Sequence, residues 1–224
     1  MRIDIVTIFP KFFNSIKNHS IIKRSLLKKK VEIFTHDIRN FSKNKQKSVD
    51  DYQFGGDPGM VLQVQPIDDC ISQLKSERDY CEIIYLSPCG ETLNQVECNR
   101  LSVLKNIILL CGNYKGIDQR AIDLHVTKEI SIGDYVLTGG EFAASIVLDS
   151  VVRLIPGVIS NESSALFDSF QDNLLAPPIY SRPALYKNLQ VPDVLLSGDT
   201  KKIDKWKEDQ IIKVTKNKRP DLLD

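Results

Sequence analysis

The stretch ISIGDYVLTGGE, residues 130–141, decides the fold of this chain. Its apolar start is typical of a buried strand, and apolar residues recur at helical spacing after it. Three glycines lie between these two elements, and glycine lets the backbone turn through positive φ or approach a ligand closely. A plain strand-to-helix turn needs only one glycine. The stretch therefore predicts a strand, a glycine-rich ligand loop and a helix in direct succession.

The same order of elements recurs along the chain. A second apolar run enters a glycine loop in LLCGNYKGIDQR, residues 109–120. Strand-like runs rich in Ile, Val and Leu occupy residues 3–8, 31–38, 82–87, 106–111 and 126–132. Helix-length stretches between them occupy residues 11–29, 66–78 and 93–104. Alternating strands and helices predict an α/β fold with a mostly parallel, buried sheet.

The last predicted helix of this region spans residues 141–155. Ala143, Val147, Val151 and Leu154 form one core-facing stripe, and a Pro-Gly pair at 156–157 ends the helix. The polar segment 41–60 is punctuated by glycine and proline and is predicted to be a loop. Long loops in compact domains are often functional.

The C-terminal part has a different composition. Serines and prolines are frequent over residues 161–178, which predicts a linker. Beyond it, Ile203, Trp206 and Val214 share one helical stripe, while the lysines at 201, 205 and 216 lie nearly opposite. We therefore predict an α/β domain at 1–160, a linker or lid at 161–171 and a small helical domain at 172–224.

Composition narrows the class of protein. With 224 residues, 42% hydrophobic and 26% charged, the chain is typical of a globular protein. No apolar run approaches the ~20 residues of a membrane span, so we expect a cytoplasmic protein without a membrane partner. The five cysteines include no C-x-x-C pair and are expected to be buried, reduced thiols. The three histidines are scattered, so no metal site is assigned.

The net charge of +1 conceals a strong asymmetry. Residues 1–50 hold 12 Lys and Arg against 4 Asp and Glu, whereas residues 51–170 hold 8 against 17. Such a basic end fits contact with a phosphate backbone. The alternative is an ordinary solvated helix face.

A series of short motifs resembles the bacterial tRNA (guanine-N1)-methyltransferases of the TrmD type, which belong to the SPOUT class. Besides the two glycine loops, the motifs that match are IVTIFP at 5–10, VDDY at 49–52, GGDPGMV at 55–61, YLSP at 85–88, RLIPGV at 153–158, DSF at 168–170, SRP at 181–183 and RPDLL at 219–223. They follow the family order over nearly the whole chain. The resemblance implies a SPOUT methyltransferase fold with a C-terminal trefoil knot near residues 85–140, followed by a small all-helical domain. General rules of topology would not predict a knot.

The family's activity is transfer of a methyl group from S-adenosyl-L-methionine to N1 of the guanine immediately 3′ of the tRNA anticodon. The resemblance thus implies tRNA as partner, a homodimer with shared active sites, and a Mg²⁺ requirement for which no site is assigned. The layout agrees with a shared site, because Asp168 lies on a serine-rich linker that could reach across to a partner. By resemblance, the donor contacts fall on Tyr85, Leu86, Ser87, Pro88, Gly112, Tyr114, Ser131, Ile132, Gly133, Tyr135, Leu137, Gly139 and Gly140. For Leu86, Ile132 and Leu137, core packing is the alternative.

Two residues match the family's catalytic positions. Methylation at guanine N1 requires loss of its proton, so a carboxylate and a cation near O6 suit the reaction. By resemblance, Asp168 is the general base and Arg153 stabilises O6. The alternatives are a helix N-cap for Asp168 and a helix-dipole partner for Arg153.

Three residues depart from the family pattern. Lys115 stands where glutamate is usual, Asn113 where arginine is usual, and Asp57 where glycine is usual. Lys115 places a positive charge beside the donor or the target base, where the family usually has a negative one. It is therefore not counted among the predicted catalytic residues.

Rival functions lack their motifs. A nicotinamide or nucleotide enzyme would need G-x-G-x-x-G after the first strand, or G-x-x-x-x-G-K-[ST], and neither occurs. A non-catalytic RNA-binding module leaves the glycine loops unexplained. The strongest alternative function is that of a SPOUT methyltransferase with another target, such as ribose or rRNA. The tract 161–183, which contains Asp168, argues against this alternative.

Overall fold

The computed structural model describes residues 1–159 and 168–223, and the chain divides into two compact units, Met1–Ser160 and Asn161–Asp224. The first unit is built on a five-stranded sheet in the order β2-β1-β6-β5-β7. All of its strand pairs are parallel. The strands are β1 (Arg2–Thr7), β2 (Glu32–Asp37), β5 (Glu82–Thr92), β6 (Asn106–Cys111) and β7 (Lys128–Ser131). The predicted parallel α/β sheet is confirmed.

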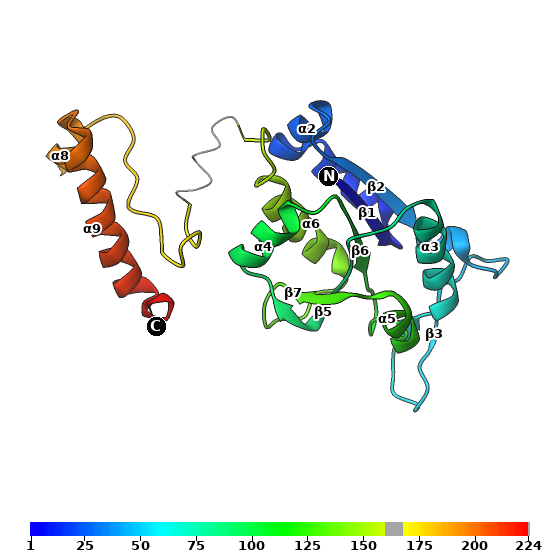
Figure 1. Cartoon of the computed structure of the whole chain (residues 1–224). Helices are drawn as coiled ribbons and strands as arrows, with labels where there is room; N and C mark the ends of the chain where they lie inside the picture. The colour runs from blue at the N-terminus through cyan, green and yellow to red at the C-terminus, as the bar shows by residue number, and fades with distance from the viewer. Residues whose placement is uncertain (160–167, 224) are drawn as a thin grey trace. The chain divides into compact units, whose positions relative to one another are not determined.

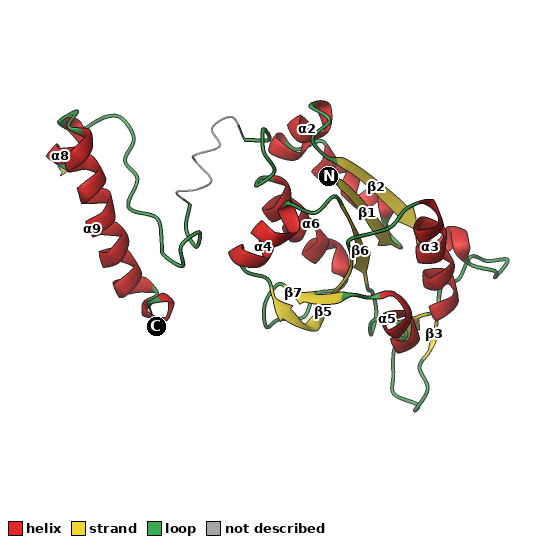
Figure 2. Ribbon diagram, viewed as in Figure 1, coloured by secondary structure: helices red, strands yellow, loops and turns green. Residues whose placement is uncertain are grey.

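Helices cover both faces of this sheet (Figures 1 and 2). One face carries α3 (Val64–Glu77) and α5 (Gln119–His125). The other carries α1 (Phe13–Lys17), α2 (Ser20–Leu27), α4 (Gln95–Ser102) and α6 (Gly140–Val152). Short 3₁₀ turns, η1 (Pro10–Phe12) and η2 (Ile38–Phe41), follow β1 and β2.

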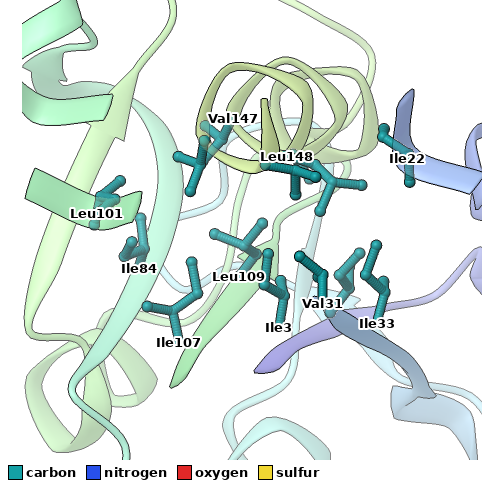
Figure 3. Packing of buried hydrophobic residues seen from close by; sticks show 14 of the residues in the cluster. Ile3, Ile22, Val31, Ile33, Ile84, Leu101, Ile107, Leu109, Val147 and Leu148 are labelled. Carbon is teal, nitrogen blue, oxygen red and sulfur yellow. The ribbon is translucent and has the colours of Figure 1, made fainter. Parts of the chain in front are cut away.

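The central strand β6 shows why the sheet is buried on both sides. Ile107 and Leu109 pack under α6, while Ile108 and Leu110 point to the face covered by α3. All four side chains are fully buried, as the alternation of side chains along a strand requires. Figure 3 shows Val147 and Leu148 of α6 above Ile107, Leu109 and Ile3.

The structure differs from two local predictions in the first unit. The stretch 11–29 is not one helix but two, because α1 ends at Lys17 and α2 begins at Ser20. The segment 41–60 is not entirely loop, because β3 (Asp50–Tyr52) pairs antiparallel with β4 (Met60–Leu62). The sequence does not reveal this pairing because three-residue strands carry almost no periodicity.

The second unit contains α8 (Asp193–Leu196) and the long helix α9 (Thr200–Lys218), closed by the 3₁₀ turn η3 (Pro220–Leu222). Two residues that precede α8 in the sequence, Leu175 and Tyr180, pack on α9. The backbone N–H of Leu175 donates to Thr215 Oγ1 at 2.9 Å, and the rings of Tyr180 and Trp206 lie 6.4 Å apart. The unit is not all-helical, because β8 (Leu185–Tyr186) and β9 (Leu189–Gln190) form a small antiparallel hairpin.

No described helix is long and apolar enough to span a membrane. Of the cysteines, Cys70, Cys98 and Cys111 are buried, as expected, but Cys81 and Cys89 are exposed. All five are free thiols, and burial raises the pKa of Cys70 to about 12.

Candidate functional site

The candidate site lies at the carboxyl ends of β6 and β7, beside residues 85–88 within β5. These residues of β5 and the segments that follow β6 and β7 surround a pocket of about 660 Å³. This is the usual position and a usual size for a ligand site in an open α/β sheet. Every residue predicted to contact the donor lines this one pocket: Tyr85, Leu86, Ser87, Pro88, Gly112, Tyr114, Ser131, Ile132, Gly133, Tyr135, Leu137, Gly139 and Gly140.

Two of the pocket loops are joined by backbone contacts. The N–H of Gly140 donates to the carbonyl of Gly112 at 2.7 Å, and Asn113 forms an isolated antiparallel bridge with Gly139. A Cβ on Gly140 would lie 2.9 Å from Cys111 Cα and 3.0 Å from Gly112 N. The absence of a side chain at 140 is therefore required by the contact of α6 with the end of β6.

A buried carboxylate stabilises the contact between the loop after β6 and the start of α6. Glu141 is only 4% exposed, and its Oε1 accepts from Thr7 Oγ1 at 2.7 Å and from Asn113 Nδ2 at 2.9 Å. It lies in the first turn of α6, where the helix dipole favours negative charge. The network ties the end of β1 to the loop after β6 and to the start of α6. The sequence alone assigned no role to Glu141 or Thr7; the one local signal was an acidic residue opening a helix after two glycines.

Apart from Lys115, the polar side chains of the pocket wall are neutral, and most of them form hydrogen bonds within the protein. Ser87 Oγ accepts from the N–H of Cys89 at 3.1 Å, and Tyr135 donates to the carbonyl of Ile132 at 3.0 Å. Burial raises the pKa of Tyr85 to about 12, so this phenol stays protonated at neutral pH. Among the described lining residues, Lys115 is the single charged side chain.

The three apolar lining residues for which core packing was the alternative differ in their burial. Leu86 is 5% exposed and belongs to the core cluster under α6, and Ile132 packs at the edge of that cluster. Leu137 is 39% exposed. Packing and pocket lining thus coincide at Leu86 and Ile132, whereas Leu137 faces the pocket without a core role.

A second, smaller pocket of about 380 Å³ adjoins the first and shares Asn113, Tyr114 and Thr138 with it. Its other lining residues are Phe9, Phe12, Glu141 and Phe142. The rings of Phe12 and Phe142 meet edge to face at 5.0 Å. Phe9 and Phe142 are each at least half exposed, so this side of the first unit is apolar and aromatic.

The two predicted catalytic residues belong to different units, and Arg153 does not line the pocket of the first unit. Arg153 is the C-cap of α6, at the end of the helix that points away from the glycine loops. Its position there agrees with the dipole alternative. Asp168 belongs to the second unit, where residues 168–174 form bends and turns. No helix begins there among the described residues, so the N-cap alternative is not supported.

The basic stretch 1–50 includes three lysines in the loop between η2 and β3. Lys43, Lys45 and Lys47 are exposed, and Lys43 Nζ lies 3.4 Å from Asp69 Oδ2. Within 1–159 and 168–223, no group of three or more His, Cys, Asp and Glu side chains is arranged to hold a metal ion.

The chain matches one protein family along its whole length. The family model described as tRNA (Guanine-1)-methyltransferase TrmD matches residues 1–224. A tRNA (guanine-N(1)-)-methyltransferase of Flavobacterium johnsoniae is 61% identical over 224 residues, covering 100% of this chain and 99% of the relative. Proteins of the same name from Christiangramia forsetii and Bacteroides thetaiotaomicron are 57% and 54% identical over 224 residues. Those alignments cover 100% of this chain, with 99% and 100% of the respective relatives.

Proposed function

This chain belongs to the TrmD family of tRNA (guanine-N1)-methyltransferases, and we propose that it transfers a methyl group from S-adenosyl-L-methionine to N1 of the guanine immediately 3′ of the tRNA anticodon. The observation that carries the proposal is the convergence of residues 85–88 of β5 and the glycine loops after β6 and β7 on one pocket, which is neutral apart from Lys115 among the described lining residues. These loops are far apart in sequence, and the family resemblance assigns each of them to the same donor.

The pocket suits the donor's chemistry. Backbone groups of the loops can hydrogen-bond the adenine edge and the ribose, while the wall at Leu86, Ile132 and Leu137 is apolar. The donor supplies an electrophilic methyl group on a sulfonium sulfur when it is bound. Neutral wall residues such as Tyr85 do not repel that positive charge.

Asp168 and Arg153 carry the proton chemistry in this proposal. The Asp168 carboxylate accepts the N1 proton as the N1–CH₃ bond forms and the S–CH₃ bond breaks. The Arg153 guanidinium hydrogen-bonds O6, where negative charge develops. The products are methylated tRNA, S-adenosyl-homocysteine and a proton held by Asp168.

The site is shared between two copies of the chain. The pocket lies at the N-terminal end of α6 and Arg153 at its C-terminal end, so one copy of the first unit does not bring the two together. A two-fold partner can do so. Exposed apolar side chains at Phe9, Phe142 and Ile146 offer a surface for such a partner.

The remaining assignments concern the chain's organisation. Residues 1–160 form the methyltransferase domain with a trefoil knot near 85–140, and residues 172–224 a tRNA-binding domain. Residues 161–171 are assigned as the linker or lid, of which 161–167 lie outside the described residues. The return of α6 onto the end of β6, through Gly140 and Gly112, supports the knot. An experimental structure whose chain ends could be pulled into an unknotted line would contradict it.

Methyl transfer from labelled S-adenosyl-L-methionine to tRNA transcripts tests the function. Transcripts with guanine after the anticodon should be labelled at N1, and matched transcripts with adenine there should not. Labelling of ribose, or of rRNA fragments in place of tRNA, would reject the proposed target and leave a SPOUT methyltransferase of other specificity.

A further inference from the structure

The turn that carries Lys115 is held on both sides. The N–H of Lys115 donates to the carbonyl of Met60 at 3.0 Å, and the N–H of Leu62 donates to the carbonyl of Gly116 at 3.1 Å. These bonds attach the turn to β4. On its other side, Asn113 bridges Gly139 and bonds the buried Glu141. The turn is therefore a rigid part of the pocket rim.

Its backbone is also strained. Gly116 donates to the carbonyl of Asn113 at 3.0 Å, which closes a β-turn with Tyr114 at φ +61°. This left-handed conformation favours glycine, and a tyrosine adopts it only when the surrounding structure imposes it. Such strain is common at ligand sites. It fixes the direction in which Tyr114 and Lys115 leave the backbone.

Gly59 leaves the space in which the aliphatic part of the Lys115 side chain lies. A Cβ at Gly59 would meet Lys115 Cγ at 2.7 Å and Cε at 3.0 Å, so the aliphatic chain lies flat across this glycine. The ammonium group is one bond beyond Cε, and it therefore lies at the Gly59 edge of the pocket. Among the described residues, the lysines in ion pairs are Lys43, Lys128, Lys202 and Lys207, and Lys115 is not one of them. Asp57 and Asp134, on neighbouring loops, do not line the pocket.

A single cation in an otherwise neutral pocket selects for one part of the donor. A positive charge repels the sulfonium and attracts a carboxylate. We propose that Lys115 binds the carboxylate of the donor's amino-acid portion, and so orients the donor with its sulfonium away from the Gly59 edge. This inference rests on the proposed function, since it requires the pocket to bind S-adenosyl compounds.

The test compares two ligands that differ in the carboxylate. S-adenosyl-homocysteine carries the amino-acid portion, and 5′-methylthioadenosine has the same nucleoside and thioether without it. In calorimetric titrations of the full chain, Lys115→Met should lower the affinity for S-adenosyl-homocysteine by about five- to tenfold, the range for a partly exposed charged pair. The affinity for 5′-methylthioadenosine should not change. Lys115→Arg should keep most of the affinity for S-adenosyl-homocysteine.

Salt and a matched lysine provide the controls. The affinity of the wild-type chain for S-adenosyl-homocysteine should fall with ionic strength, and this dependence should flatten in Lys115→Met. Lys105→Met removes an exposed lysine outside the pocket and should alter neither ligand's affinity.

Other results would overturn the inference. An equal loss for both ligands would make Lys115 a packing residue. No loss for either ligand, with weaker tRNA binding instead, would assign the lysine to an RNA phosphate. Failure of the wild-type chain to bind S-adenosyl-homocysteine at all would refute the donor pocket itself, which is a separate result.

Discussion

Gly140 and Arg153 stand at opposite ends of helix α6: Gly140 is its first residue and Arg153 its C-cap. At a rise of 1.5 Å per residue, they are separated by about 20 Å. The backbone N–H of Gly140 bonds Gly112 in the pocket wall, whereas an arginine side chain spans well under half of that separation. This separation supports the proposal that the pocket of one chain and Arg153 of another form one site.

Mixing two inactive variants tests the shared site. Leu137→Arg places a bulky cation in the pocket of one chain, and Arg153→Ala removes the guanidinium from the other. A heterodimer with shared sites holds one site with both residues intact, so random exchange should restore about a quarter of wild-type activity. We choose Leu137 because it faces the pocket without a core role, whereas a side chain at Gly140 would separate α6 from β6.

A mixture of Leu137→Arg with a second substitution of the same pocket residue, Leu137→Trp, is the control and should stay inactive. If mass spectrometry shows exchanged subunits and the Arg153→Ala mixture is still inactive, the shared site is rejected.

Asp168→Asn should slow methyl transfer by about 10²-fold or more, because the amide keeps the shape of the side chain but cannot accept the N1 proton. Single-turnover rates and donor affinity are measured separately, and donor affinity should be unchanged. Asp172→Asn removes an exposed carboxylate four residues away and should retain wild-type rates. A near-normal rate for Asp168→Asn would exclude this residue as the base.

Glu141→Ala should lower the free energy of unfolding by about 2 kcal/mol, because it leaves the buried donors of Thr7 and Asn113 without their charged acceptor. Affinity for S-adenosyl-homocysteine should fall as well, since Asn113 holds the bridge to Gly139. Urea unfolding and calorimetry provide the two measurements, with the exposed Glu208→Ala as control. Unchanged stability would mean that the network contributes nothing.

Asp4 should make the first unit sensitive to acid. Burial opposes ionisation of this carboxyl, but hydrogen bonds from His36, Arg2 and Tyr80 outweigh burial and lower its pKa to about 2. Because the folded pKa lies below the unfolded value of about 3.9, the stabilisation is present above pH 4 and is lost as the pH falls toward 2. The wild-type chain should therefore lose about 2 kcal/mol relative to Asp4→Asn across this range. Parallel stability curves for the two proteins would contradict the role of Asp4.

Replacing Lys43, Lys45 and Lys47 together by glutamine should weaken tRNA binding and flatten its salt dependence. For every phosphate that a lysine no longer neutralises, the slope of log K against log salt should decrease by about 0.9. Lys43 is partly engaged by Asp69, so its contribution should be the smallest of the three. A Lys75→Gln, Lys105→Gln double variant provides exposed control sites. If the triple variant keeps the wild-type slope, this loop is an ordinary solvated surface.

The sequence by itself determined the parallel α/β sheet and the edge of the sheet at which the glycine loops meet. Runs such as Ile107–Leu110 are apolar at every position because both faces of their strand are covered. A glycine loop placed directly after such a strand must lie at the carboxyl edge of the sheet. Local spacing therefore predicted that the loops at Gly112 and Gly133 meet at one edge, whereas the individual contact residues, Ser87 among them, were predicted from the family resemblance.

Only the tertiary structure decided what holds that site together. Thr7 and Glu141 are separated by 134 positions, and no local pattern relates them. The stem of Lys115 meets Gly59 through the pairing of its turn with β4, a strand too short to be recognised from periodicity. The distance from Arg153 to the pocket follows from the direction in which α6 crosses the sheet. Periodicity fixes which face of an element is buried, whereas packing between distant segments fixes which of them meet.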